Sequence, residues 1–486
     1  MIVSLLTSVV FARYLTQEGL GTYRQAFLAY NFVTPLLTLA LPQALYFFLP
    51  KYPDRDRSVL LTNVLMLTAL GAVFSLALAF GGSQLLARRF NNPALRDVMR
   101  IFTPYPLFMF PAAALSACMV SKERVTALTT YTLLSQVSLA IATITICVLS
   151  QDPVLLLAVA VGFAFVTLIP ALVLMWRTCT TGPWRFDPAM GWSMVKYTIP
   201  LGLSGLLGTL ALQMAGVIVS SLRTPGEFAI FSIGSVEIPL IVIVTGSIST
   251  VILADMARLC QGRDYATALG LFRTAAIRSS VILLPAMMFL LAAARPFIEG
   301  LYSARYEGSV IVFQLYLLLL PIRVVYYGPA LMALGRTQQV LWRSIGDFAL
   351  TGLLCLLFVR WFGYLGAVAA LLVTIYAWSV PFNLYFISKG FGVRVKDVLP
   401  LRELVQVGVL AAIPTVLASA WRLLPGIPRL GQLLLAFVLY APLTYFLLWR
   451  AGFLPMDFLV KLPLVGPFAA RLVRILELHG RTKVAS

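Results

Sequence analysis

Charged residues are scarce in this chain of 486 residues, where they make up only 11% of the sequence. Soluble domains carry about 25% charged residues, so the deficit argues against a large aqueous domain. Acidic residues are especially scarce. The chain has 18 Asp and Glu and 37 Lys and Arg, which gives a formal net charge of +19. The two deficits together indicate a basic protein that lies mostly in lipid.

Histidine and paired cysteines, the usual ligands of structural metal sites, are also nearly missing. The one histidine is His479, and the five cysteines form no C-x-x-C pair. Most of these cysteines fall in or beside apolar stretches, where Cys is usually a small packing residue. We therefore expect no metal site built from His and Cys, and nothing in the sequence indicates a cofactor.

The positive charge does not form a nucleic-acid-binding surface, because the sequence has no basic run and no RNA-binding motif. Lys and Arg lie mostly in the short connections between apolar stretches. This placement is typical of the positive-inside rule and of contact with anionic lipid, and part of the excess is available for an anionic substrate. We expect membrane lipids, and not nucleic acid, as partners.

Apolar stretches of membrane-spanning length fill the chain almost from end to end, and 60% of its residues are hydrophobic. Because a bilayer core of about 30 Å needs about 20 apolar residues as helix, the sequence predicts an all-α membrane protein with about 14 transmembrane helices. The predicted spans are residues 1–15, 26–49, 59–80, 101–120, 127–150, 153–176, 197–221, 228–253, 272–294, 309–334, 343–362, 364–388, 403–424 and 430–450.

The distribution of Lys and Arg predicts that both termini are cytoplasmic. In that orientation the cytoplasmic connections hold about twice as many Lys and Arg as the outer ones, as the positive-inside rule requires. One loop runs against the rule, because Arg88, Arg89, Arg96 and Arg100 would lie outside. Residues 451–486 are predicted to be a cytoplasmic tail with an amphipathic helix on the membrane surface, and a disordered tail is the alternative.

Short segments recur in the two halves of the chain, which indicates an internal repeat. Residues 20–23 (LGTY) and 228–231 (FAIF) each follow a polar turn, and residues 114–117 (ALSA) resemble residues 330–333 (ALMA). Six spans followed by six in the same orientation form the pattern of a transporter with two parallel repeats and a central cavity. We therefore predict two six-helix lobes plus two extra C-terminal helices. The predicted boundaries are 1–176 for the N-lobe, 197–388 for the C-lobe and 403–450 for the extra pair.

Residues 12–23 (ARYLTQEGLGTY) resemble the N-terminal signature of bacterial polysaccharide-biosynthesis membrane proteins. These are the Wzx-like flippases of the multidrug/oligosaccharidyl-lipid/polysaccharide exporter superfamily. Residues 334–336 (LGR) and 363–369 (GYLGAVA) resemble the second half of that family. The resemblance implies that a polyprenyl-pyrophosphate-linked oligosaccharide is moved across the bacterial inner membrane for surface polysaccharide synthesis. The resemblance also implies that polysaccharide-assembly proteins are possible partners.

Charged side chains inside the spans are candidate functional residues, since each costs at least about 2.5 kcal/mol at mid-bilayer. Arg323 lies near the middle of the span at 309–334, whereas Arg24 and Arg13 flank the first polar turn. A planar guanidinium binds phosphate oxygens in bidentate fashion and stays charged when buried. Given the implied substrate, we predict that Arg24 and Arg323, with Arg13 as a weaker candidate, contact the pyrophosphate. The alternative for Arg13 and Arg24 is that they are ordinary loop arginines with no role in substrate binding.

Coupling to an ion gradient has one candidate carboxylate. Family members often carry an acid in the seventh span, but here residues 213–216 read Gln-Met-Ala-Gly. Glu237, in the span at 228–253, is the best remaining carboxylate, and a structural ion pair with Arg323 is the alternative. Gln25 and Gln213 are predicted to hold sugars, and further polar and aromatic side chains are available. These are Tyr23, Gln43, Gln136, Tyr316, Tyr326 and Tyr327.

Three other functions stay open. An integral-membrane glycan polymerase or glycosyltransferase would need outer carboxylates, but the longest outer connection, residues 81–100, has Asp97 alone. A cation-coupled drug antiporter of the same superfamily should line its cavity with acids, whereas the charges within the spans are mostly arginine. A membrane scaffold without transport activity is the third. The absence of an ATP-binding motif favours a transporter that works by alternating access.

Overall fold

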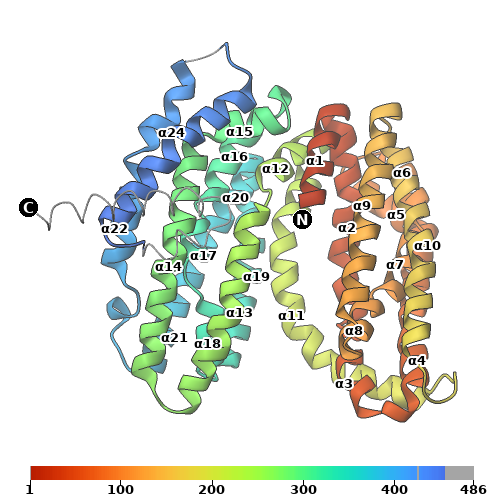
Figure 1. Cartoon of the computed structure of the whole chain (residues 1–486). Helices are drawn as coiled ribbons and strands as arrows, with labels where there is room; N and C mark the ends of the chain where they lie inside the picture. The colour runs from red at the N-terminus through yellow and green to blue at the C-terminus, as the bar shows by residue number, and fades with distance from the viewer. Residues whose placement is uncertain (1, 424–425, 455–486) are drawn as a thin grey trace, which may run out of the picture. The chain divides into compact units, whose positions relative to one another are not determined.

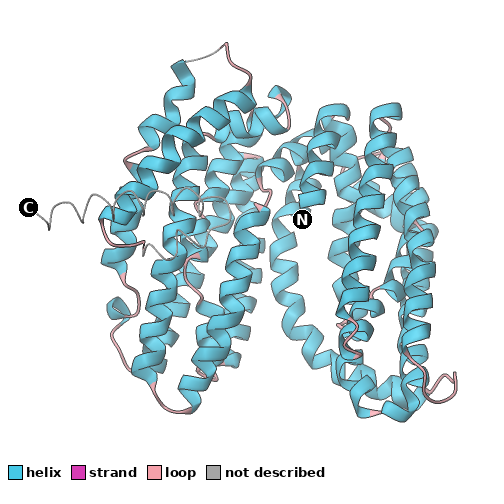
Figure 2. Ribbon diagram, viewed as in Figure 1, coloured by secondary structure: helices cyan, strands magenta, loops and turns pink. Residues whose placement is uncertain are grey.

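The computed structural model describes residues 2–423 and 426–454, and within them the regular structure is helical, with no strand (Figures 1 and 2). Eight of the described helices are long and apolar enough to cross a membrane, or up to ten if each of two bent pairs is one span. Within the described residues, each of the fourteen predicted spans is mostly helical. The all-α prediction is therefore confirmed. The predicted amphipathic helix of the tail lies outside the described residues.

The chain divides into two compact units. The first contains Met1–Pro239 and Leu341–Ser379, and the second contains Leu240–Val340 and Val380–Ser486. This division differs from the predicted lobes, because the helices over 188–234 and most of those over 337–373 group with the first six spans. The two-lobe organisation stays a prediction.

The helices of the first unit have the following bounds. They are α1 (Ile2–Tyr14), α2 (Gln17–Thr38), α3 (Ala44–Lys51), α4 (Asp56–Ala77), α5 (Ser83–Arg89), α6 (Leu95–Phe102), α7 (Tyr105–Ala112), α8 (Ala114–Ser121), α9 (Val125–Ser150), α10 (Pro153–Thr178), α11 (Pro188–Leu222), α12 (Pro225–Gly234), α19 (Thr337–Phe362) and α20 (Tyr364–Val373). Those of the second unit are α13 (Pro239–Gln261), α14 (Tyr265–Ala292), α15 (Ala294–Leu301), α16 (Gly308–Leu317), α17 (Leu320–Arg323), α18 (Tyr327–Ala333), α21 (Val380–Phe391), α22 (Leu401–Ala412), α23 (Thr415–Ala418) and α24 (Arg429–Arg450).

Several predicted spans are bent or interrupted rather than continuous. The second bends by 51° between Thr38 and Leu41, where Leu39 and Ala40 adopt left-handed backbone conformations. The fourth bends by 47° between α6 and α7. The eighth separates into α12 and α13 at residues 235–238, and the tenth comprises α16, α17 and α18. Prolines stand at several of these breaks, where they remove a backbone donor.

The first helical turns of the two halves fold alike. α2 begins after Thr16, whose side chain accepts a hydrogen bond from the backbone N–H of Gly19 at 3.0 Å. α12 begins after Thr224, whose side chain accepts from the backbone N–H of Glu227 at 3.2 Å. Such caps satisfy backbone donors that the first turn leaves without partners. The two threonines stand at equivalent positions of the predicted repeat, so the local structure agrees with the repeat here.

α2 and α12 pack against each other at Gly21, where no side chain fits. A Cβ atom on Gly21 would lie 1.9 Å from the backbone carbonyl oxygen of Pro225. We expect Gly21→Ala to push the helices apart and to destabilise the protein by about 1–3 kcal/mol. Thermal unfolding of the purified protein in detergent measures this. Gly162→Ala on α10 is the matched control, since a Cβ there meets nothing within 4 Å. An unchanged melting temperature for Gly21→Ala would contradict the close packing.

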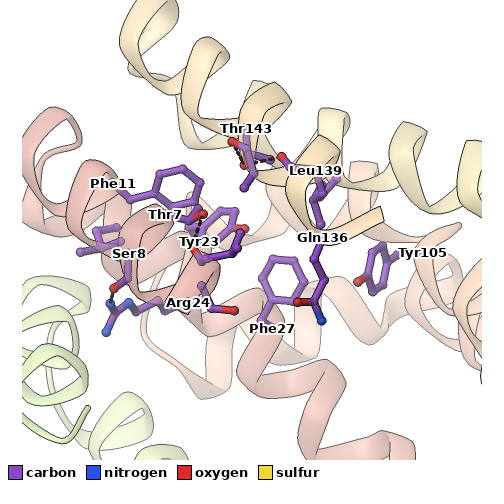
Figure 3. Close-up of a pocket in the computed structure, with 15 residues that line it drawn as sticks. Thr7, Ser8, Phe11, Tyr23, Arg24, Phe27, Tyr105, Gln136, Leu139 and Thr143 are labelled. Carbon is purple, nitrogen blue, oxygen red and sulfur yellow. Dashed lines mark hydrogen bonds between the residues drawn. The ribbon is translucent and has the colours of Figure 1, made fainter. Parts of the chain in front are cut away.

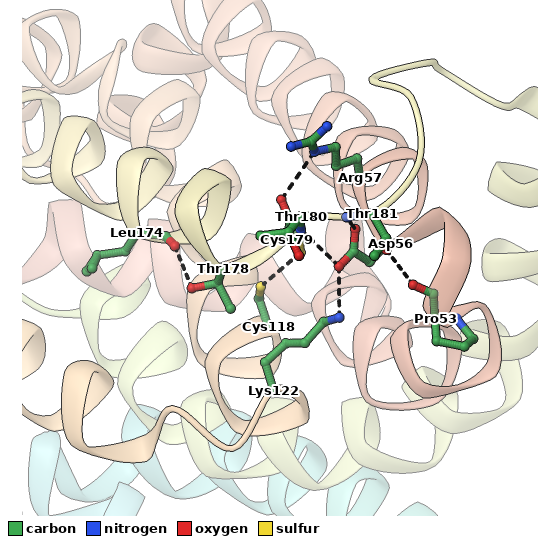
Figure 4. A network of polar contacts seen from close by, with 10 residues as sticks. All are labelled: Pro53, Asp56, Arg57, Cys118, Lys122, Leu174, Thr178, Cys179, Thr180 and Thr181. Atoms are coloured by element: carbon green, nitrogen blue, oxygen red, sulfur yellow. Dashed lines mark hydrogen bonds and ion pairs between the residues drawn. The ribbon is translucent and has the colours of Figure 1, made fainter.

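The connection from α10 to α11 is fastened to the start of α4 by a polar network (Figure 4). The buried carboxylate of Asp56 accepts hydrogen bonds from the backbone N–H groups of Thr180 at 3.1 Å and Thr181 at 2.8 Å. The ammonium group of Lys122, at the end of α8, lies 2.8 Å from the same carboxylate. A buried charge needs such partners to offset the loss of hydration. The network therefore anchors the segment before α11 to α4 and α8.

Candidate functional site

A cavity of about 320 Å³ lies within the first unit, where α1, α2, α7, α9 and α10 provide its lining residues (Figure 3). Its walls differ in chemistry. One wall carries an arginine, a second carries aromatic rings, and small hydroxyl groups and an amide complete the lining. A concave site with a few polar groups on an apolar background is typical of small-molecule binding sites.

Arg24 supplies the positive charge of this cavity. Its Nη2 donates a hydrogen bond of 2.6 Å to Oγ of Ser8 on α1, and its Nη1 donates one of 2.6 Å to Oγ of Ser232 on α12. Ser232 and Arg24 are 208 residues apart, which is the offset of the predicted repeat. Because two hydroxyl groups hold the half-buried guanidinium, its plane is oriented before any ligand binds. Short bonds of this kind, in which the donor is charged, are stronger than neutral ones.

The aromatic wall consists of rings in mutual contact. Tyr23 packs against Phe11 and against Phe27, with ring centroids 5.1 Å apart in both pairs. Phe27 in turn meets Tyr105 of α7 edge to face at 5.7 Å. Tyrosine offers an apolar ring together with a hydroxyl group, so it can contact a ligand that has both kinds of surface.

Hydroxyl groups on α1 and α9 complete the lining. Ser4, Thr7 and Ser8 follow the spacing of one face of α1, and Thr143 and Gln136 come from α9. Thr7 donates its proton to the carbonyl of Val3 at 3.0 Å, and Thr143 donates to the carbonyl of Leu139 at 2.7 Å. Each of these oxygens keeps acceptor capacity for a ligand, since a hydroxyl has one donor and two lone pairs.

The charge of the lining has one sign. Among the described residues that line the cavity, Arg24 is charged and none is Asp or Glu. A concave site with positive charge and low-dielectric walls attracts anions. The cavity is therefore suited to a ligand that combines an anionic group with hydroxyl groups.

The structure places the predicted substrate-binding residues in different environments. Arg24 lines the cavity, as do Tyr23 and Gln136 from the wider set. Gln25 is fully buried on another face of α2, where its amide oxygen accepts a hydrogen bond of 2.7 Å from Asn92. Arg13 is exposed at the end of α1, and Gln213 is half-buried on α11; neither lines the cavity. The roles predicted for these residues stay predictions.

Glu237 and Arg323 both lie where a predicted continuous span is interrupted. Glu237 is exposed in the non-helical segment between α12 and α13, in the first unit. Arg323 is half-buried as the last residue of the four-residue helix α17, in the second unit. Interrupted helices supply substrate and ion sites in many transporters, because their freed backbone groups need polar partners. Both residues remain candidates.

Sequence reasoning missed the hydroxyl groups of α1, Thr143 and Tyr105. The signal on α1 was present, because Ser4, Ser8 and Phe11 stand at the i, i+4 and i+7 positions of one helical face. Charged residues are conspicuous in an apolar span because of their cost in lipid. A hydroxyl that bonds to its own helix costs little and is inconspicuous.

Comparison with known proteins adds a family and a fold. The family model described as "polysaccharide biosynthesis protein" matches residues 10–311. The structure is similar to that of a lipid II flippase, MurJ, in an inward closed conformation, with a TM-score of 0.72 and 15% identity, covering 93% of this chain and 97% of that one. It is also similar to an inward-facing MATE multidrug resistance transporter of the MOP superfamily, with a TM-score of 0.61 and 13% identity, over 80% and 94% of the two chains. No curated protein sequence matches significantly.

Proposed function

Because the chain belongs to the polysaccharide biosynthesis protein family, we propose that it is a flippase that moves a polyprenyl-pyrophosphate-linked oligosaccharide across the bacterial inner membrane. The flippase and transporter folds that it resembles support a transporter rather than an enzyme. The observation that carries the proposal is the cavity in which Arg24 stands among hydroxyl groups and aromatic rings.

The lining of the cavity matches the two parts of such a head group. The guanidinium of Arg24 is a planar, permanently charged donor for pyrophosphate oxygens. Ser8 and Ser232 hold it at 2.6 Å each, and each terminal nitrogen keeps a second N–H that can bond to phosphate. Hydroxyl oxygens of Thr7 and Thr143 accept hydrogen bonds from sugar hydroxyls, and the rings of Tyr23 and Phe27 cover apolar sugar faces.

A cationic drug is a poorer fit to this lining. An antiporter for cations would place carboxylates around its substrate, whereas the described lining of the cavity has arginine as its charged side chain. Bringing a cation beside Arg24 costs Coulomb energy that a partly dry site does not screen. The sign of the charge therefore favours the lipid-linked glycan.

Transport proceeds by alternating access, because the sequence carries no ATP-binding motif. Both termini lie in the cytoplasm, in agreement with the distribution of Lys and Arg. Membrane lipids surround the protein, and polysaccharide-assembly proteins receive the exported glycan.

Complementation of glycan export in a deletion strain, normalised to the protein level, tests the proposal. Purified protein should also bind a polyprenyl-pyrophosphate glycan more tightly than the same glycan without its pyrophosphate. Restored export and this preference support the flippase. A protein that inserts at normal levels, restores no export and ignores the pyrophosphate would exclude it.

Ion coupling, if it uses a carboxylate, should depend on Glu237. We expect Glu237→Gln to weaken the response of transport to an imposed ion gradient by about tenfold or more, because the amide cannot exchange a proton or balance a cation. Transport into proteoliposomes at several imposed gradients measures this. Glu227→Gln is the matched control, since Glu227 belongs to the capping box of α12 and should affect stability rather than coupling. Full transport by Glu237→Gln at every gradient rules out this role.

A further inference from the structure

The arginine-rich loop that runs against the positive-inside rule forms an open basin with a volume of about 650 Å³. The end of α5 and the beginning of α6 both contribute residues to its lining. Arg88 and Arg96 line it together with the polar residues Gln84, Asn91 and Asn92, and Asp97 stands among them. The cavity at Arg24 has a different lining, so the basin is a separate feature.

The floor of the basin is held in place by hydrogen bonds. Asn91 adopts a left-handed conformation with φ of 46°, and the N–H of Asn92 then bonds to the carbonyl of Ala87 at 2.9 Å, which ends α5. The side chain of Asn92 is buried, and its Nδ2 donates to Oγ1 of Thr22 at 2.8 Å and to Oε1 of Gln25 at 2.7 Å. The turn between the two arginines is therefore fastened to α2.

The positive charge of the basin is not neutralised by the protein. The side chains of Arg88 and Arg96 are exposed, and within the described part of the chain they make no hydrogen bond or ion pair. Asp97 is the acidic residue of the described lining, and it also lies 3.5 Å from Arg100, so it offsets only part of the positive charge of the basin. Two guanidinium groups that share a polar basin repel each other unless an anion lies between them.

Exposed apolar side chains adjoin the arginines. Phe80 is 86% exposed and Leu85 is 69% exposed, just before Arg88 in the chain. In a membrane protein such side chains lie in hydrocarbon, and a following arginine reaches the level of the lipid phosphates. Anionic head groups are therefore the anions within closest reach of the basin.

We propose that the basin is a binding site for a lipid phosphate group, which Arg88 and Arg96 hold through charge-assisted hydrogen bonds. The amides of Gln84 and Asn91 are additional donors at the same place. The phosphate comes from a bilayer phospholipid or from a polyprenyl carrier, which share this chemistry. The inference does not depend on the proposed transport, because it rests on the basin alone.

α2 separates this site from the cavity at Arg24. Thr22 and Gln25 on one face of the helix contact Asn92 below the basin, whereas Tyr23 and Arg24 line the cavity. Substitutions of Arg88 and Arg96 therefore change the basin without touching the cavity.

Native mass spectrometry of the purified full chain tests the site with three probes. They are dioctanoyl phosphatidylglycerol, farnesyl pyrophosphate and dioctanoylglycerol, which has no phosphate. We expect the double variant Arg88→Gln/Arg96→Gln to bind at least one phosphate probe about tenfold more weakly, because two charge-assisted contacts are lost. Dioctanoylglycerol should bind equally to both proteins. Melting temperatures confirm that the variants are folded.

Arg89→Gln is the matched control, because it removes the same charge from the neighbouring residue, which does not line the basin. It should weaken binding less than about twofold. Asp97→Asn is a gain variant, and we expect it to strengthen binding about twofold by removing an anion from the lining. If the double variant loses binding of phosphatidylglycerol alone, the ligand is a phospholipid. If it loses binding of farnesyl pyrophosphate alone, the ligand is the polyprenyl carrier. Either result supports the site. An equal loss in Arg89→Gln, or no loss in the double variant, overturns it.

Discussion

Replacing Arg24 with alanine is expected to reduce export per molecule by about 100-fold, because a desolvated pyrophosphate loses its charged partner at a cost of about 3 kcal/mol. Arg24 is the charged residue among the described residues of the cavity lining, so no neighbouring lining residue compensates. Export in the deletion strain, divided by the amount of inserted protein, measures the effect. Binding of the purified variant to a polyprenyl-pyrophosphate glycan should fall in parallel.

Two further variants separate charge from geometry at this position. Arg24→Lys keeps the charge but replaces a planar fork with a point charge, so we expect an intermediate loss of about tenfold. Ser232→Ala keeps the guanidinium and removes one of the two hydroxyls that orient it at 2.6 Å, and its effect should be smaller still. Normal export per molecule by Arg24→Ala would remove Arg24 from the substrate site.

The helical spans could be predicted from the sequence because they depend on local properties. A run of about 20 apolar residues must be helical in lipid to satisfy its backbone, whatever lies beside it. The interruptions could not be predicted in the same way. Pro35 lies inside the continuous helix α2, whereas the break follows at Leu39 and Ala40. Proline is tolerated inside membrane helices when neighbours satisfy the freed carbonyl, so its position alone does not locate a break.

The candidate site was predictable in part, and α2 shows why. Arg24 was predicted from its position beside the first polar turn and from the pyrophosphate that the family resemblance implies, since a guanidinium binds phosphate oxygens. Gln25 carries no charge, and the sequence does not show which face of α2 packs against the neighbouring helices. Its partner Asn92 is 67 residues away, so only the tertiary structure shows that Gln25 is buried outside the cavity. Thr7 and Thr143 were missed because each hydroxyl donates a hydrogen bond to a backbone carbonyl of its own helix. Such a residue is tolerated in an apolar span, so the sequence does not mark it as functional.

Replacing Arg323 with alanine is the second change for which we expect a loss of about 100-fold in export per molecule. Arg323 ends α17, in a span whose helix is interrupted, and a charge kept there in lipid must contact a polar group. If that group is the pyrophosphate, Arg323→Lys should also be impaired although its charge is kept, because lysine cannot bind two phosphate oxygens in a planar fork.

The control for Arg323 distinguishes a substrate contact from a structural one. Arg278 lies on the continuous helix α14 of the same unit and is exposed, so Arg278→Ala removes an arginine from outside the interrupted span and should leave export within about twofold of normal. If Arg323 is structural instead, Arg323→Ala should lower the melting temperature and the amount of inserted protein. Each molecule that does insert should then export normally. A folded, inserted Arg323→Ala protein that exports at the normal rate per molecule would therefore show that Arg323 does not bind the substrate.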